Sequence, residues 1–587
     1  MRPYCHVLTG LACLLFAATV ATAQEPIHVQ IDRLVSARFA DRAPTGIVED
    51  ANFVRRVWLD LAGRIPSAEQ ARTFLRDNSE DKRGREIDRL LAAPSYAEHM
   101  TDRFHVMLME RRGDEPHWQT FLRNCFERNQ PWNQVVREIL KPEDQDETRR
   151  GAAYFYTKRL EKYGQNPIDY SGLTRDVGRL FLGVDLQCAE CHDHLFIDAY
   201  KQQEFQGLFV VYKGLSLRRG VKFPAIDEKA MTSRLEFVSV FESTKRQTGP
   251  RIPFGEEFCL PEAVADPASK APEPTFSALE LIARELPSAN RELFTKNIAN
   301  RLWFQMMGRG LVEPLDQFHS GNPPSHPQLL DLLAREFAAH EFDIKWFLRE
   351  LALTDTYQRS TRFQAGTAAT DATDPPMSAQ TGSAQTGSAQ TGSAQTGSAK
   401  DVPAQKESAQ KETGQQRSIQ KASARQPDDE DGSLYRVANE KRLSAEQLFR
   451  STLLATGGPS RESKNEEGVT EGDDLRARFL KAFANEAREP EIQQNATVKA
   501  ALFLLNDDKL LALLEPQDGN LVGRLAKIAE ERELCDELFL SVFTRLPNDE
   551  ERATVTGYLQ TNTERRDVAL GHLVWSLLTS MEFCVNH

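Results

Sequence analysis

The most distinctive chemical feature of this sequence is the run Cys188-Ala-Glu-Cys191-His192. The C-x-x-C-H spacing is typical of a c-type haem attachment sequence. Two thiols about one helical turn apart can add to the two vinyl groups of a haem, while the adjacent imidazole reaches the iron from the same face. The pattern predicts a haem c cofactor, with Cys188 and Cys191 as covalent anchors and His192 as the proximal ligand.

Two other kinds of site would use the same residues. A non-haem metal, zinc or iron, could be bound by Cys188, Cys191, His192 and His194, because these are acceptable ligand types. Alternatively, the two cysteines form a C-x-x-C disulfide with a structural or redox role. A low-spin haem also needs a second axial ligand, and the sequence favours none of the conceivable side chains: Met107, Met109, Met231, His105 and His319.

The N-terminal residues have the pattern of a secretory signal peptide. Arg2 precedes an apolar stretch from Leu8 to Val20, and Ala21 and Ala23 form an A-x-A cleavage site. We therefore expect residues 1–23 to be removed and the protein to be secreted or periplasmic. Since c-type haem is attached outside the cytoplasm, export favours the haem interpretation. No later segment has the 18 or more uninterrupted apolar residues that a membrane-spanning helix needs, so no transmembrane segment is expected in the mature chain.

Charge and cysteine content restrict the partners. The formal net charge is −13, and no basic stretch is long enough to follow phosphates, so we expect no nucleic-acid partner. An exported redox or envelope protein is the expected partner. Six of the eight cysteines remain after removal of the signal peptide. Cys125 with Cys259, or Cys535 with Cys584, could form disulfides in an oxidising compartment.

The residues around the motif must be positioned mainly by helices. Apolar residues at helical spacing run from Ile31 to Leu75, and Gly63 is expected to end one helix before a capping box, Ser67 to Gln70, begins the next. Further helices are expected at 85–93, 94–110, 118–140, 172–181, 278–307 and 327–354. The segment Gly63 to Glu69 is echoed by Thr544 to Glu550, which indicates two similar helix-turn-helix units.

The expected fold class is mainly α, with two helical domains, a small β-rich insertion between them and a disordered linker inside the second. Strands are expected at 207–212, 220–224 and 235–241. The linker contains four tandem copies of S-A-Q-T-G and few apolar residues. The expected boundaries are 1–23 for the signal peptide, 24–206 for the C-x-x-C-H domain, 207–262 for the β-rich region, 263–363 and 431–587 for the second helical domain, and 364–430 for the linker.

No competing catalytic motif is present. The patterns G-x-S-x-G, H-E-x-x-H, G-x-G-x-x-G and the P-loop are all absent, so the sequence does not decide whether the protein is an enzyme. Four arginines, Arg55, Arg56, Arg301 and Arg309, could contact a ligand, but we expect them to pair with acidic neighbours such as Asp60 or Asp316.

Several long segments resemble a known family. They are Phe53 to Pro66, Phe181 to His194, Asn300 to Trp303, Met307 to Val312, Asn322 to Pro327, Thr356 to Arg359 and Leu573 to Phe583. Together they resemble a tandem family of secreted planctomycete proteins, in which a cytochrome-c-like domain of unknown function is followed by a planctomycete-specific domain of unknown function. The resemblance covers nearly the whole mature chain except the linker.

The resemblance implies a cytochrome-like first domain but supplies no catalytic residues. Members often read C-H-D-H-P-F at the motif, whereas this chain has Leu195 in place of the proline. The recurring H-D-H triplet suggests a role for His194, which a lone haem attachment would not require. Three functions therefore stay open: a haem protein for electron transfer or sensing, a metal-binding protein or enzyme of the cell envelope, and a structural or interaction scaffold with a C-x-x-C disulfide.

Overall fold

The computed structural model describes residues 25–229, 231, 233–260, 277–362, 430–458, 471–489 and 497–587. The predicted signal peptide lies outside the described residues. So does the predicted linker, except for Glu430, which begins a helix. Within the described part of the chain, no helix combines the length and the apolar character needed to cross a membrane.

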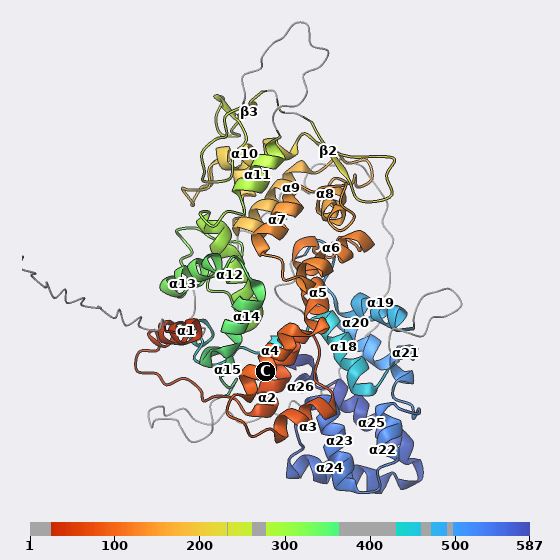
Figure 1. Ribbon diagram of the computed structural model, residues 1–587. Helices are drawn as coiled ribbons and strands as arrows, with labels where there is room; N and C mark the ends of the chain where they lie inside the picture. The colour runs from red at the N-terminus through yellow and green to blue at the C-terminus, as the bar shows by residue number, and fades with distance from the viewer. Residues whose placement is uncertain are drawn as a thin grey trace, which may run out of the picture.

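The first half of the chain is helical up to residue 212 (Figure 1). Its helices are α1 (Ile27–Ser36), α2 (Asp50–Ala62), α3 (Ala68–Arg76), α4 (Lys82–Ala92), α5 (Pro94–Met109), α6 (Pro116–Glu127), α7 (Trp132–Leu140), α8 (Tyr154–Arg159), α9 (Tyr170–Val177) and α10 (Gln202–Tyr212). Between them lie the 3-10 turns η1 (Arg150–Ala153) and η3 (Cys188–Glu190) and the π-helix η2 (Gly178–Leu182).

Helices resume at residue 278. They are α11 (Ala278–Glu285), α12 (Glu292–Met307), α13 (Pro327–Ala339), α14 (Ile344–Leu353) and α15 (Asp355–Gln358), then α17 (Glu430–Leu434), α18 (Ala445–Thr456), α19 (Glu471–Phe483), α20 (Val498–Asn506), α21 (Asp508–Ala512), α22 (Leu521–Ala526), α23 (Glu531–Phe543), α24 (Asp549–Thr561), the 3-10 turn η5 (Thr563–Arg565), α25 (Arg566–Leu578) and α26 (Met581–Cys584).

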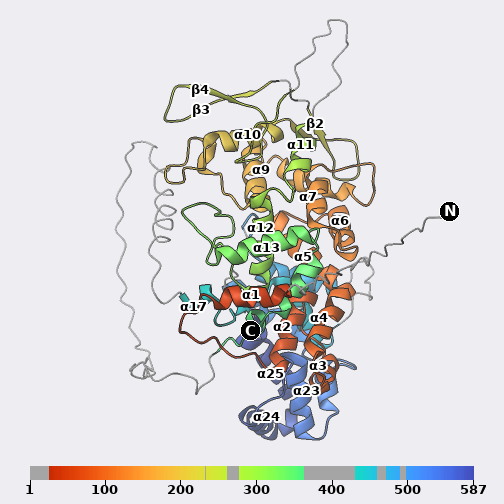
Figure 2. The same cartoon turned by 60° about the vertical axis from the view of Figure 1, so that its left-hand side comes forward.

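The strands of the described chain are short and form separate antiparallel pairs. β1 (Leu215–Leu217) pairs with β2 (Ile226–Glu228), β3 (Leu235–Val238) with β4 (Lys245–Thr248), and β5 (Lys441–Arg442) with β6 (Val585–Asn586). Figure 2 shows β3 and β4 beside α10 at one end of the molecule, far from α23 and α24 at the other end. The predicted mainly helical fold with small β elements around residues 215–248 is confirmed.

Several predicted elements were wrong in detail. Residues 207–212, expected as a strand, form the second half of α10, because a short apolar run buried on several sides has no period that separates strand from helix. The expected helix at 118–140 is divided before Trp132 by Pro131, and the one at 278–307 is divided near Pro287. No strand forms at 220–224.

The predicted helix-turn-helix units are present in both places. Gly63 ends α2 with a φ of 68°, and Thr544 ends α23 with the same φ, so the backbone adopts the left-handed conformation at both helix ends. Ser67 and Asn548 then cap α3 and α24 with complete capping boxes. The two units lie side by side, because α3 packs on α23 and Arg72 is ion-paired with Glu537.

Two hydrophobic clusters form the core. The larger one runs from Ile31 to Tyr435 and is shared by α1–α10 and α11–α15, so the first and second helical units are not separate cores. The smaller one is built by residues 443–583, and Leu59 and Ile65 of the N-terminal hairpin complete it. The expected domain boundaries stay a prediction, since a shared core does not define them.

A buried carboxylate ties these parts together. Asp60, on α2 and 4% exposed, accepts hydrogen bonds from Lys441 Nζ at 2.7 Å, Tyr357 Oη at 2.8 Å and Asn586 Nδ2 at 2.9 Å. Lys441 Nζ also donates to the carbonyl of Met306. Asp60 therefore joins α2 to α15, β5 and β6, and through Lys441 to α12.

The arginines beside Asp60 do not pair with acids as expected. Arg55 donates to the carbonyls of Val542 and Phe583, and Arg56 donates to those of Arg359 and His587. Both guanidiniums hold the C-terminal chain against α2, and desolvation lowers the pKa of Arg55 to about 10. Backbone carbonyls, which sequence patterns do not reveal, serve as their partners.

We expect Asp60→Ala to lower the free energy of unfolding by about 3–5 kcal/mol, because it leaves the ammonium of Lys441 buried without its counter-charge. Urea denaturation of the purified protein measures this effect. Asp518→Ala is the matched control, since Asp518 also pairs with a lysine but has a side chain that is 95% exposed. Equal stability of the two variants would contradict the role assigned to Asp60.

We also expect stability to fall as the pH drops from about 6.5 to 4, in part through His326. Burial, with repulsion from Arg38, lowers the pKa of His326 to about 4, so the unfolded chain binds a proton there that the folded chain does not. His326→Gln should reduce the slope of unfolding free energy against pH by up to about 1.4 kcal/mol per pH unit in this window. Urea midpoints across the window measure it, and parallel slopes for the two proteins would exclude this contribution.

Candidate haem attachment site

The C-x-x-C-H run lies between the π-helix η2 and α10. Gly183, with a φ of 70°, ends η2, and Cys188 begins the 3-10 turn η3. Both motif cysteines are exposed, and the turn between them is held by its backbone. Gln206 Nε2 donates to the carbonyl of Glu190 at 2.8 Å, and Val240 N–H donates to that of Cys191 at 3.0 Å. The motif is thus fixed to α10 and to the β3–β4 hairpin.

The ring of His192 has a defined proton arrangement. Its Nδ1 lies 2.6 Å from the carbonyl oxygen of Asp193, and because a carbonyl only accepts, Nδ1 carries the hydrogen. Nε2 of the neutral ring then has a free lone pair. This is the arrangement of most metal-bound histidines, in which one nitrogen donates to a carbonyl and the other binds the metal.

His194 and His319 have the opposite arrangement. His194 Nδ1 accepts from the backbone N–H groups of Phe196 and Ile197, and His319 Nδ1 accepts from that of Gly321. In the neutral rings the hydrogen therefore lies on Nε2, so neither ring offers a lone pair there. Burial lowers the pKa of both rings, which favours these neutral forms.

The two rings are nevertheless neighbours of the motif. His194 and His319 each pack edge-on against Tyr200, with ring centroids 5.9 Å apart in both cases. The hydroxyl of Tyr200 donates to the carbonyl of Phe318, which links the motif segment to the loop after α12. Both histidines serve as packing around Tyr200 in this structure.

A patch of exposed apolar side chains surrounds His192 and His194. Its members are Leu195, Phe196, Val240 and Phe241, and each is at least 66% exposed. The Phe241 ring lies 4.7 Å from the His192 ring, and Phe196 lies 6.4 Å from His194. Clustered apolar side chains of this size cost free energy in water, so such a patch usually marks a binding surface.

The cysteines are free thiols. All six that remain after the predicted cleavage are unpaired, so the suggested disulfides Cys125–Cys259 and Cys535–Cys584 and the alternative Cys188–Cys191 disulfide are not formed in this structure. Cys125 is 2% exposed whereas Cys259 is exposed, so burial separates that pair. Burial, together with Asp185, raises the pKa of Cys188 and keeps this thiol protonated.

The non-haem metal alternative receives no support from the geometry. Among the described residues, no group of three or more His, Cys, Asp or Glu side chains is arranged to hold a metal ion. Cys188, Cys191, His192 and His194 follow the exposed turn instead of converging, and His194 is turned toward the backbone of its own loop.

Three of the conceivable second axial ligands are engaged elsewhere. His105 Nδ1 accepts the indole N–H of Trp118, the sulfur of Met109 accepts from Arg159, and Met107 lines an internal cavity. Met231 packs on the core as a partly buried side chain. His319 is the candidate that the fold brings nearest to the motif, through Tyr200.

Comparison with known families gives two matches. Residues 30–216, which include the C-x-x-C-H run, match PSCyt2, a protein of unknown function (DUF1549). Residues 280–382 match PSD1, a protein of unknown function (DUF1553). No curated protein and no solved structure matches the chain.

The fold and the first match define a mainly helical protein with a planctomycete cytochrome-like domain. More particularly, the chain carries a PSCyt2 domain followed by a PSD1 domain, in the order that the resemblance predicted. Both domains are of unknown function, so the matches indicate a cytochrome-like character and no reaction.

Sequence reasoning missed three supporting residues of the site. Tyr200, Val240 and Phe241 fix or cover the motif but lie outside it in the sequence, whereas Asp193 directly follows it. The adjacent pair Leu195 and Phe196 was a usable signal, because two apolar residues directly after a polar metal-type motif indicate an apolar surface.

We expect three accessible thiols per chain when the protein is made without haem. Cys188, Cys191 and Cys259 are exposed and should react with Ellman's reagent in the native state, whereas buried Cys125 and Cys535 should react only after unfolding. Thiol counts before and after denaturation measure this difference. If a Cys188–Cys191 disulfide existed instead, the native count would rise by two upon reduction.

Proposed function

We propose that this protein is an exported c-type haem protein that serves in electron transfer or in sensing a small ligand. The observation that carries the proposal is the free Nε2 of His192 beside two exposed thiols. The same arrangement fits haem chemically, because the site supplies two thiols that can form thioether bonds, one imidazole lone pair and an adjoining apolar surface.

Each motif residue has a separate task in this proposal. The thiols of Cys188 and Cys191 would each add across a vinyl group, so that sulfur bonds to one carbon and the thiol hydrogen passes to the other. His192 would direct Nε2 at the metal, with its ring held by the carbonyl of Asp193. Leu195, Phe196 and Phe241 would exclude water from the bound group. When bound, a haem would supply a one-electron redox couple or a position for a small ligand.

The proton arrangement of the neighbouring histidines bears on the choice between these roles. His194 and His319 keep Nε2 protonated and are packed on Tyr200, so neither is prepared to act as a second axial ligand. A haem held by His192 alone would leave room for a small ligand, which favours ligand binding over electron transfer alone. A partner, in either role, would be an exported redox or envelope protein.

The test is to produce the full-length chain in a host with c-type haem maturation and to record a pyridine haemochrome spectrum. We expect about one haem per chain, still attached after denaturation, because thioether bonds survive unfolding. The Cys188→Ser and Cys191→Ser double variant should lose covalent haem, and Cys259→Ser, which changes an exposed cysteine outside the motif, should retain it.

Elemental analysis for iron and zinc completes this experiment. Full incorporation of covalent haem that depends on the two motif cysteines supports the proposal. Zinc or iron in stoichiometric amount without a haem spectrum, or neither metal nor haem in the periplasmic protein, would overturn it.

A further inference from the structure

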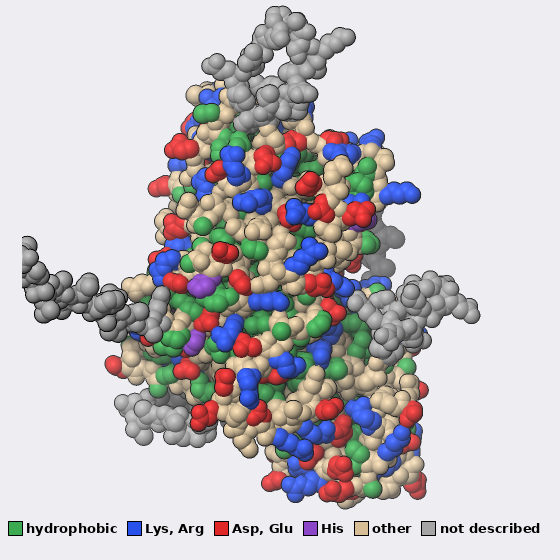
Figure 3. Space-filling view, in the orientation of Figure 1, with side chains coloured by type: hydrophobic (Ala, Val, Ile, Leu, Met, Phe, Trp, Pro, Cys, Tyr) green, Lys and Arg blue, Asp and Glu red, His purple; other side chains and the backbone are tan. Residues whose placement is uncertain are grey.

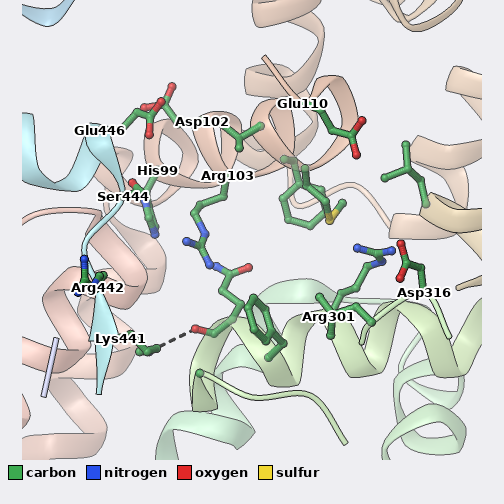
Figure 4. Close-up of a pocket in the computed structure, with 18 of the residues that line it drawn as sticks. His99, Asp102, Arg103, Glu110, Arg301, Asp316, Lys441, Arg442, Ser444 and Glu446 are labelled. Atoms are coloured by element: carbon green, nitrogen blue, oxygen red, sulfur yellow. Dashed lines mark hydrogen bonds between the residues drawn. The ribbon is translucent and has the colours of Figure 1, made fainter. Parts of the chain in front are cut away.

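A cavity of about 470 Å³, open to solvent on one side, lies between the helices of the two family-matched regions. Its walls come from α5, from η2, from α12 and from the strand β5 with the start of α18 (Figure 4). The volume is in the range of small-molecule binding sites. Apolar side chains form part of the wall: Phe104, Val106, Met107, Leu180, Phe304 and Leu315.

The acidic side chains of this cavity are neutralised by arginines. Glu110 is ion-paired with Arg179 at 2.5 Å and with Arg112 at 2.6 Å. The remaining buried or partly buried acids are paired as follows: Asp102 with Arg450 and Arg476, Glu446 with Arg111, and Asp316 with Arg179. Glu440 and Arg442 lie at the exposed edge. The acids of the wall therefore leave little uncompensated negative charge inside.

Arg301 differs from these neighbours. Its Nε donates to Asn297 Oδ1 at 3.0 Å and its Nη2 to the carbonyl of Arg179 at 2.8 Å, but it forms no ion pair with any described residue. Burial lowers its pKa to about 10, and the attraction of Asp316 only partly offsets that effect. A partly buried guanidinium without a counter-charge of its own is costly, and a bound carboxylate would reduce that cost.

His99 presents a second unused group to the same cavity. Its side chain is 1% exposed, and its Nε2 has no hydrogen-bond partner. Figure 4 shows the His99 ring turned toward the interior, with Arg103 extending into the same space. Burial and Arg103 lower the pKa of His99 well below its usual range, and the nearby backbone of Asp60 only partly offsets this effect. In a neutral ring whose Nδ1–H donates to a carbonyl, Nε2 accepts a hydrogen bond.

We propose that this cavity binds a hydroxylated organic carboxylate with an apolar body. The carboxylate would bind Arg301, which has no anionic partner of its own among the described residues, and a ligand hydroxyl would donate to His99 Nε2. The apolar wall would contact the carbon skeleton. This site is separate from the C-x-x-C-H motif, so the proposal does not depend on the presence of haem.

Isothermal titration calorimetry with 4-hydroxybenzoate as the probe tests this proposal. We expect millimolar or tighter binding to the full mature chain, and about tenfold weaker binding of 4-hydroxybenzamide, which keeps the shape and loses the charge. Benzoate, which lacks the hydroxyl, should bind less tightly than 4-hydroxybenzoate. His99→Phe should abolish the preference for the hydroxylated probe without abolishing the preference for the carboxylate.

Arg301→Gln should weaken carboxylate binding by about tenfold or more. Its thermal midpoint without ligand should equal or exceed that of the unchanged protein, because the variant removes a partly buried charge that has no ion-pair partner among the described residues. Arg335→Gln, at an exposed arginine on α13, is the matched control and should bind normally. Absence of binding by the unchanged protein, equal binding of the acid and the amide, or unchanged binding by Arg301→Gln would each overturn the proposal.

Discussion

The ion pair between Asp60 and Lys441 is the interaction on which much of the tertiary structure depends. It joins residues that are 381 positions apart, and the same carboxylate accepts from Tyr357 and Asn586. Burial lowers the pKa of Lys441 to about 8 although Asp60 favours the charged form, so the pair is held in a poorly solvated position. Loss of either partner would leave a buried charge that no other described group neutralises as closely.

Arginine side chains also connect distant segments of the chain, and the groups that accept their hydrogen bonds differ. Arg55 and Arg56 are satisfied by backbone carbonyls, whereas Arg179 is surrounded by Glu110, Asp176 and Asp316. The pKa of Arg179 is raised by these carboxylates despite desolvation, whereas desolvation lowers that of Arg301. Arg179 on η2 therefore has carboxylate partners and a structural role, whereas the adjacent Arg301 on α12 has none among the described residues and is available to a ligand.

At the surface, basic and acidic side chains are interspersed over the face shown in Figure 3.

The candidate haem site and the cavity are connected by one short segment. Arg179 and Leu180 of η2 line the cavity, and the chain then turns at Gly183 toward the C-x-x-C-H motif. A π-helix costs backbone stability relative to an α-helix and is often found at functional sites. Here it places Arg179 among its three acids while its end directs the motif to the surface. Asn297, on α12, donates to the carbonyl of Leu180 and holds this segment in place.

The sequence by itself determined the local features of this protein. The C-x-x-C-H spacing, the capping box at Ser67 and the turn at Gly63 depend on neighbouring residues, and the long segments shared with the tandem family are read directly from residue order. The helical class followed from apolar periodicity for the same reason. Short apolar runs such as 207–212 failed because periodicity over six residues does not separate a strand from a buried helix.

Only the tertiary structure decided which distant groups meet. The proton position on His192 depends on the local fold that brings the Asp193 carbonyl within 2.6 Å. The apolar patch depends on a hairpin about 50 residues after the motif, and Asp60 meets a lysine 381 positions later in the chain. Whether Arg301 gains a carboxylate partner depends on how α12 packs against η2. These outcomes follow from side-chain packing between segments far apart in sequence, and the order of residues alone does not specify which of those segments come into contact.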